Sequence, residues 1–141
     1  MKFWDSSALV PLYVEEATTA LLQEQFADDS AVYVWWATPV ECVSGVAKLH
    51  REGGFTTELY DKALEALALA SSIWRPIAPT DTLRLEAIRI VRVHGLKAAD
   101  ALQLAAAREW SQHRPAGYHF VSLDQKLRRA ARLEGFTVLP Q

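Results

Sequence analysis

Short apolar runs alternate with longer amphipathic segments along this chain. The runs that are rich in β-branched and aromatic residues predict strands, at residues 1–4, 31–36, 118–122 and 136–139. A further short run, at residues 73–78, fits either a strand or an extended crossover. The segments between these runs have helical periodicity and predict helices at residues 6–14, 15–28, 38–52, 56–72, 79–94, 98–113 and 124–134.

Local sequence features mark the ends of several predicted helices. The segment Thr38-Pro39-Val40-Glu41 has the form of a capping box with a proline at the start of the helix. Gly95 and Gly135 follow two other helices at the position where glycine commonly ends one. Short apolar strands that alternate with amphipathic helices predict a parallel sheet of four to five strands, covered by helices on both faces. The pattern therefore predicts an α/β fold.

The composition is that of an ordinary globular protein. Half of the 141 residues are hydrophobic and 23% are charged, and this length predicts one domain over residues 1–141. No stretch approaches the roughly 20 apolar residues of a membrane span, and Asp5, Glu15 and Glu16 rule out a secretory signal at the start. Cys42 is the only cysteine, which excludes an intramolecular disulfide and a thiolate zinc site. We therefore expect a cytoplasmic protein without a membrane partner.

Charge is distributed unevenly between the two halves of the chain. Residues 1–74 contain 4 Lys/Arg and 11 Asp/Glu, a net charge of −7, whereas residues 75–141 contain 11 Lys/Arg and 6 Asp/Glu, a net charge of +5. This asymmetry suits a cation site bordered by a surface that tolerates phosphates, although solvated helix faces of different charge explain the counts more simply. The overall charge of −2 argues against indiscriminate coating of nucleic acids.

Four acidic residues fall where predicted strands end or predicted helices begin. Asp5 directly follows the first strand, and Asp124 lies two residues beyond the strand that ends at Ser122. Glu41 lies in the first turn of the helix after the second strand, and Asp100 opens the alanine-rich helix. Because open parallel sheets place their sites beyond the carboxyl ends of the strands, we expect all four acids at one edge of the sheet.

Each acid also has a purely structural explanation. Asp5 and Asp124 fit helix N-caps, Glu41 fits the return arm of a capping box, and Asp100 fits a first-turn partner of the helix dipole. Carboxylates that converge, however, repel one another unless a proton or a cation neutralises them. Hard divalent ions such as Mg²⁺ prefer oxygen ligands, and such an ion activates water for phosphodiester hydrolysis. As a group, the acids therefore predict a metal-dependent hydrolase of phosphodiesters.

Features of other site classes are missing from the sequence. The four histidines, His50, His94, His113 and His119, do not have the spacing of metal ligands. There is no Walker-type glycine loop and no G-x-G-x-x-G segment, which argues against a nucleotide-binding protein.

Four segments resemble the PIN-domain ribonucleases. In family order they are FWDSSALV, TPVECVSG, LKAADALQLAAA and FVSLDQKLRRAARLEGFTVLP. Together they span essentially the whole chain, and in length the chain is most similar to the small VapC-type toxins of bacterial and archaeal toxin–antitoxin pairs. The resemblance implies a three-layer α/β/α fold and an endoribonuclease that depends on Mg²⁺ or Mn²⁺.

The resemblance also implies roles for individual residues. The acidic positions of the family correspond to Asp5, Glu41, Asp100 and Asp124. Of these, Asp5, Asp100 and Asp124 are expected to hold the metal, and Glu41 either to hold it or to orient the attacking water. Three hydroxyl side chains are candidates for fixing the carboxylates: Ser6, Ser7 and Ser122. Three basic side chains are candidates for contacts to RNA phosphates: Lys97, Arg128 and Arg129.

The resemblance further implies a homodimer, and inhibition by an antitoxin segment that lies across the active-site groove. The sequence contains more large apolar side chains than are needed to cover a thin sheet, and exposed apolar patches often mark protein contacts. These residues are Leu12, Tyr13, Val14, Trp35 and Trp36. Aromatic strands are also typical of a core, and a core position is the simpler interpretation for Trp35 or Trp36 alone.

We therefore predict a toxin-type endoribonuclease with RNA as substrate and an antitoxin as partner. Two alternatives remain open at this point. One is a PIN-fold binding module without catalytic activity, although four intact acids argue against it. The other is a PIN-like nuclease that acts on DNA, for which the chain looks short.

Overall fold

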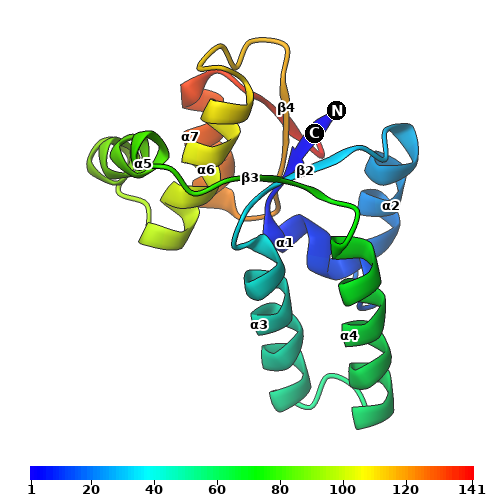
Figure 1. The fold of residues 1–141 in the computed structure, drawn as a ribbon. Helices are drawn as coiled ribbons and strands as arrows, with labels where there is room; N and C mark the ends of the chain where they lie inside the picture. The colour runs from blue at the N-terminus through cyan, green and yellow to red at the C-terminus, as the bar shows by residue number, and fades with distance from the viewer.

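Five short strands form one sheet at the centre of the computed structural model, which describes residues 1–141 (Figure 1). The strands are β1 (Lys2–Trp4), β2 (Val32–Trp35), β3 (Arg75–Ile77), β4 (His119–Val121) and β5 (Thr137–Leu139). Their order in the sheet is β3-β2-β1-β4-β5, and all neighbouring pairs are parallel. The predicted α/β fold is confirmed, and the ambiguous run at residues 73–78 contains a strand.

Seven α-helices and one short 3-10 helix connect the strands. They are α1 (Ser6–Leu9), the 3-10 helix η1 (Val10–Leu12), α2 (Thr19–Asp28), α3 (Thr38–Arg51), α4 (Thr57–Ser71), α5 (Asp81–His94), α6 (Ala98–Trp110) and α7 (Gln125–Glu134). None of these helices has the length and apolarity needed to span a membrane.

The helices lie where the sequence predicts them, with differences at their ends. The predicted helix at residues 6–14 is divided into α1 and η1 between Leu9 and Val10, just before Pro11, which has no backbone N–H to continue an α-helix. The predicted helix at residues 98–113 ends early, because Gln112 and His113 have positive φ angles of 53° and 58°.

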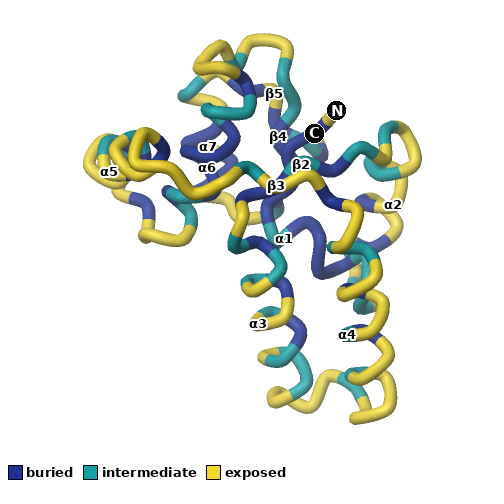
Figure 2. Tube along the Cα trace, in the orientation of Figure 1, coloured by how far each residue is buried: buried dark blue, intermediate teal, exposed yellow.

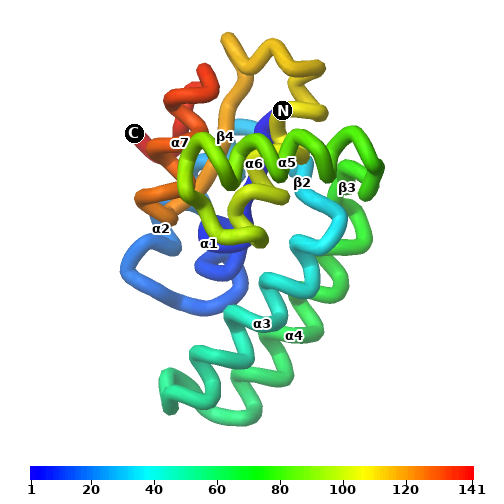
Figure 3. The backbone as a smooth tube through the Cα atoms, turned by 90° about the vertical axis from the view of Figure 1, so that its left-hand side faces the viewer, coloured from blue at the N-terminus to red at the C-terminus, as the bar shows by residue number.

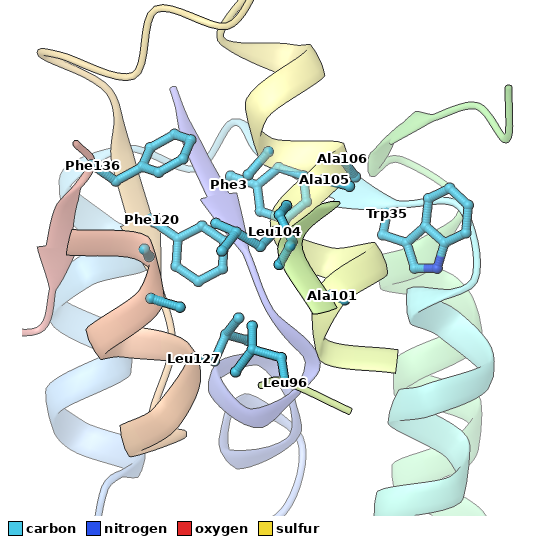
Figure 4. Packing of buried hydrophobic residues seen from close by; sticks show 14 of the residues in the cluster. Phe3, Trp35, Leu96, Ala101, Leu104, Ala105, Ala106, Phe120, Leu127 and Phe136 are labelled. Atoms are coloured by element: carbon cyan, nitrogen blue, oxygen red, sulfur yellow. The ribbon is translucent and has the colours of Figure 1, made fainter. Parts of the chain in front are cut away.

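Side chains along each strand alternate between two separate cores. Phe3, Trp35 and Phe120 pack with residues of α5, α6 and α7 on one face of the sheet, and Figure 4 shows their rings among the side chains of this core. Trp4 and Val34 pack against α1 to α4 on the other face. The central strands and the inner sides of the helices are buried, because helices cover both faces of the sheet, while the edge strand β3 and the outer sides of the helices are largely exposed (Figure 2).

Helices α3 and α4 form a hairpin that extends away from the sheet (Figures 1 and 3). Buried contacts join the two helices, including those of Val46 and Leu67. The outer side of α4 nevertheless exposes the large apolar side chains of Leu59, near its start, and Leu69, near its end. The hairpin therefore presents apolar surface both near its tip and next to the sheet.

A network of ion pairs, the ionic network below, holds α5, α6 and α7 together. Its members are Glu86, Arg89 and His94 of α5, Arg108 of α6 and Glu134 of α7. Arg89 bridges Glu86 and Glu134 with both Nη2–oxygen distances at 2.7 Å. Arg108 pairs with the same two carboxylates, and His94 Nε2 lies 2.8 Å from Glu134 Oε1. These contacts fix the position of the α5–α6 connection, which leads directly to Asp100.

Candidate active site

The order of the strands creates a crevice next to β1. The chain adds β2 and β3 on one side of β1, and then returns to place β4 and β5 on the other side. In open parallel sheets such a reversal is the usual position of a binding site, outside the carboxyl ends of the strands. Trp4 of β1 is in register with Val121 of β4, and the Asp5 N–H donates to the Val121 carbonyl at 3.0 Å. Asp5 therefore lies beside the residues that follow β4.

Asp5 is buried at this crevice and surrounded by hydroxyl groups. Its Oδ2 accepts hydrogen bonds from the Ser7 hydroxyl, from the Ser122 hydroxyl at 3.0 Å and from the Ser7 N–H at 3.3 Å. Asp5 also caps α1, so the structural explanation holds as well. Burial raises the pKa of Asp5, although the hydrogen bonds from Ser7 and Ser122 counteract this effect, and the charge of Asp124 raises it further.

The two serine hydroxyls also connect Asp5 to the loop after β4. The Ser7 Oγ accepts from the Leu123 N–H at 2.9 Å, and the Ser122 Oγ accepts from the Asp124 N–H at 3.1 Å. The two hydroxyl oxygens are 3.3 Å apart. The structure therefore brings Ser7 and Ser122 together with Asp5, and it fixes the backbone from which Asp124 projects.

Glu41 reaches the crevice from the first turn of α3. Its Oε2 accepts from the Ser6 hydroxyl at 3.2 Å and from Gln103 Nε2 at 2.6 Å. Burial raises the pKa of Glu41, and the charges of Asp5 and Asp100 raise it further, while the hydrogen bond from Gln103 lowers it. The predicted capping box is wrong. Ala37 is the N-cap of α3, and the buried Thr38 hydroxyl inside the helix instead accepts from Gln103 at 3.1 Å.

Asp100 and Asp124 complete the group from two further elements. Asp100 lies in the first turn of α6, where burial and the charges of Asp124 and Asp5 raise its pKa to about 6 against the influence of nearby Lys97. Asp124 is exposed and caps α7, accepting from the Leu127 N–H at 2.8 Å. For Asp124, as for Asp5, capping and membership of the group are compatible.

These four carboxylates are called the acidic cluster below, and they come from the residue after β1, from α3, from α6 and from the loop after β4. Their charges act on one another, and Lys97 is the only cation among the causes that shift their pKa values. No three of the protein's His, Cys, Asp and Glu side chains lie close enough to form a ready-made metal cage. A groove of about 300 Å³ beside the cluster is lined by Ser6, Ser7, Glu41 and Lys48, among others. The arrangement concentrates negative charge at an open groove, where oxygen ligands are available to a hard cation.

The comparisons with known proteins agree with this geometry. The sequence matches the PIN domain family over residues 2–133. This chain belongs to the PIN domain family. PIN domains are generally nucleases and generally use divalent metals. A search of curated protein sequences gives no significant match.

Solved structures show the same PIN fold. The crystal structure of PAE2754 from Pyrobaculum aerophilum is 20% identical, with a TM-score of 0.68 over 98% of this chain and 88% of that chain. The crystal structure of FitAcB from Neisseria gonorrhoeae is 17% identical, with a TM-score of 0.66 over 99% of this chain and 97% of that chain. At these identities the likeness concerns the fold of the PIN domain.

The basic residues predicted to contact RNA lie in different environments in this PIN domain. Lys97 is exposed at the start of α6, and Arg129 is exposed on α7. Arg128 is buried, and its guanidinium donates to the carbonyls of Ser122 at 2.6 Å, Leu139 at 3.1 Å and Pro140 at 2.6 Å. The expectation that Arg128 contacts RNA is therefore corrected: this side chain ties the loop after β4 to the C-terminal segment.

The sequence analysis missed one polar residue of the PIN site, Gln103. Its amide joins Glu41 to Thr38 from within the core. The available clue was a lone amide in the apolar run of α6, three residues after Asp100 and hence on the same side of the helix. A glutamine in an alanine-rich helix is ordinary when its burial is unknown, so only the fold reveals this contact.

Proposed function

We propose that this PIN-domain protein is a metal-dependent endoribonuclease and the toxin of a toxin–antitoxin pair. The main support is the acidic cluster, in which four carboxylates from separated parts of the chain converge without a neutralising arginine. Three of its members, Asp5, Glu41 and Asp100, have raised pKa values because of burial and mutual repulsion. Perturbed carboxylates in a crevice are typical of functional sites.

The residues of the acidic cluster fit Mg²⁺ or Mn²⁺. Carboxylate and hydroxyl oxygens are suitable ligands for these ions, and Mg²⁺ usually takes one or two carboxylates and completes its shell with water. Asp5, Asp100 and Asp124 would hold the ion directly or through water, which explains why no complete cage of protein ligands is needed. When bound, the ion supplies a more acidic water and stabilises negative charge on the scissile phosphate.

The protein's own side chains would orient the reacting groups. Ser7 and Ser122 fix the rotamer of Asp5 through its Oδ2. Ser6 holds the Glu41 carboxylate on the side of Asp5, since its hydroxyl is within 3.5 Å of Asp5 Oδ1 and 3.2 Å of Glu41 Oε2. In this position Glu41 would accept a hydrogen bond from the attacking water and aim it at the phosphate.

Exposed basic side chains next to the acidic cluster would bind the RNA backbone. A groove of about 370 Å³ runs between the end of α5 and the surface of α7, and Gly95, Lys126 and Arg129 line it. Neither Lys126 nor Arg129 forms an ion pair within the protein. Lys97 lies in the connection from α5 to α6, between this groove and Asp100. Such cations position phosphates without reading sequence.

Exposed apolar surface supports the proposed homodimer and antitoxin. Trp35 is buried, but Trp36 is 59% exposed at the same edge of the sheet as the acidic cluster. Tyr13 and Val14 line an apolar groove of about 470 Å³ together with Phe55 and Leu59 of the α3–α4 hairpin region. Large exposed apolar residues beside a site are typical of protein contacts.

A cleavage assay on both nucleic acids tests the proposal. Purified protein is incubated with end-labelled single-stranded RNA and with DNA of the same sequence, in Mn²⁺ or in EDTA. We expect RNA to be cut in Mn²⁺ and to stay intact in EDTA. Cleavage of DNA alone would favour the DNA nuclease, and binding of RNA without cleavage in any divalent metal would favour the binding module.

A further inference from the structure

Gln103 is a fully buried amide in an apolar environment. It lies in α6, and its neighbours in the helix, Ala101, Leu104 and Ala105, are buried as well. A polar side chain at such a position loses its hydrogen bonds to water and needs partners inside the protein. The position of Gln103 therefore has to be explained by the contacts that its amide makes.

Both contacts of Gln103 lead to the first turn of α3. Its Nε2 donates to Glu41 Oε2 at 2.6 Å and to Thr38 Oγ1 at 3.1 Å. The opposite orientation of the amide would place a carbonyl oxygen against the carboxylate of Glu41, which is repulsive. The amide is thus oriented by the charge of Glu41, and in return it holds Glu41 from the core side, opposite Ser6.

The same orientation leaves the other end of the amide without a partner. The Oε1 atom of Gln103 is buried and accepts no hydrogen bond. An unpaired buried carbonyl costs free energy, whereas an apolar side chain of similar volume would avoid this cost. Fold stability alone therefore does not account for glutamine here. Natural proteins commonly break a local packing rule where a functional residue has to be held.

We propose that Gln103 is a positioning residue that fixes the Glu41 carboxylate toward Ser6 and Asp5. This inference rests on the proposed nuclease function and adds a residue to it. Without Gln103, the hydrogen bond from Ser6 at the exposed side is the only one left on Glu41. The carboxylate then rotates among several conformations and orients the attacking water less often.

The test replaces Gln103 by methionine, which has a similar volume and no donor, and separately by leucine. We expect Gln103→Met to lower kcat for RNA cleavage about tenfold or more while KM changes less than about twofold. The melting temperature should change little, because the removal of the unpaired carbonyl offsets the loss of the two hydrogen bonds from the amide. A crystal structure of the variant should show Glu41 displaced from Ser6. If one variant fails to fold, the other provides the same measurements.

Thr38→Val is the matched control, because it removes the other partner of the same amide and leaves Glu41 untouched. We expect its kcat to remain within about threefold of the wild type. If kcat fell equally in Thr38→Val and Gln103→Met, the proposal would be overturned, and the role of the amide would be to hold α3 and α6 together. An unchanged kcat with Glu41 still beside Ser6 in Gln103→Met would overturn it too. If the wild type does not cleave RNA, the nuclease proposal fails, and the position of Glu41 in the variant's crystal structure still decides the role of Gln103.

Discussion

Two clusters of acidic side chains in this protein are in opposite electrostatic situations. In the ionic network, hydrogen bonds from Arg89 and Arg108 lower the pKa of Glu86 despite its burial. Burial alone would raise the pKa of Glu134, but hydrogen bonds from His94 and Arg89 and the charges of both arginines lower it overall. In the acidic cluster, no arginine is present, and the pKa values of Asp5, Glu41 and Asp100 are raised.

Under the proposed function, this difference separates a structural use of carboxylates from a catalytic one. The ionic network contains its own cations, so its charges are balanced in the folded protein and connect three helices. The acidic cluster is held in place by serine hydroxyls and an amide, which fix its geometry without cancelling its charge. The carboxylates of the cluster therefore still repel one another in the folded protein, and a bound cation would reduce this repulsion. The following experiments test this comparison.

Of all the changes considered, Asp5→Asn should have the largest effect, and this effect should be on the rate of RNA cleavage. The amide keeps the shape of the side chain but removes the charge that holds a cation, so we expect RNA cleavage in Mn²⁺ to fall at least about a thousandfold. Circular dichroism should show an intact fold. Asp81→Asn, an exposed aspartate in the first turn of α5, is the control and should cleave like the wild type. Undiminished cleavage by Asp5→Asn would contradict a functional role for the cluster.

Glu134→Ala should have the largest effect on stability. Its side chain is only 11% exposed, and its loss leaves Arg89 and Arg108 without one of their two partners. We expect a loss of about 2–3 kcal/mol in the free energy of unfolding, less than for a fully buried pair because Arg89 is 40% exposed. Urea titration measures this loss.

Glu58→Ala is the control for Glu134→Ala. It breaks the exposed pair with Lys62, in which the side chains are 79% and 67% exposed. It should cost less than about 0.5 kcal/mol. Equal losses in both variants would show that the ionic network contributes no more than a surface pair.

Mn²⁺ should stabilise the protein through the acidic cluster and not through the ionic network. At ten times its dissociation constant, a ligand that binds only the folded state adds about 1.4 kcal/mol, which corresponds to roughly 4–5 °C in melting temperature for a protein of this size. Differential scanning fluorimetry should show this rise in the wild type and in Glu134→Ala, and should not show it in Asp100→Asn. A rise of the same size in Asp100→Asn would place the ion elsewhere.

The change of stability with pH should be the smallest effect. Its sign should be opposite for the acidic cluster and for the ionic network. Folding raises the pKa of Asp100 from 3.8 to about 6, so the folded protein binds the proton more tightly. The stability that this provides is fully present below about pH 4 and is lost as the pH rises through about 6. Glu86 and Glu134 behave oppositely, because their lowered pKa values give stability that is present above about pH 4.5 and is lost on acidification.

Asp100→Asn isolates the contribution of the acidic cluster, because the ionic network is the same in both proteins. In EDTA at pH 7 we expect the variant to be more stable by on the order of 1 kcal/mol, a value discounted for the partial exposure of Asp100. The difference should shrink toward zero at pH 4. Thermal unfolding between pH 4 and pH 7 measures this difference. If the wild type became more stable relative to the variant as the pH rises, the raised pKa of Asp100 would be contradicted.

The sequence alone predicted the positions of the strands and nearly all helices, because these depend on local periodicity and on residues such as Gly95 and Gly135 at helix ends. It also predicted that Asp5, Glu41, Asp100 and Asp124 would gather at one edge of the sheet, since in a parallel sheet the end of each strand determines where the next residues lie. Helix ends were less predictable. The positive φ angles of Gln112 and His113, for example, are not encoded by either residue type.

Only the tertiary structure decided how each polar side chain is used. Arg128 and Arg129 are neighbours on α7, and a rotation of about 100° along the helix places the first inside the protein and the second at the surface. Thr38 looks like a helix cap in the sequence and Gln103 like an ordinary residue of an alanine-rich helix, yet their side chains meet between two helices in the core. Local pattern fixes which residues share an element, whereas burial and hydrogen-bond partners depend on contacts between residues far apart in the chain, which no local pattern contains.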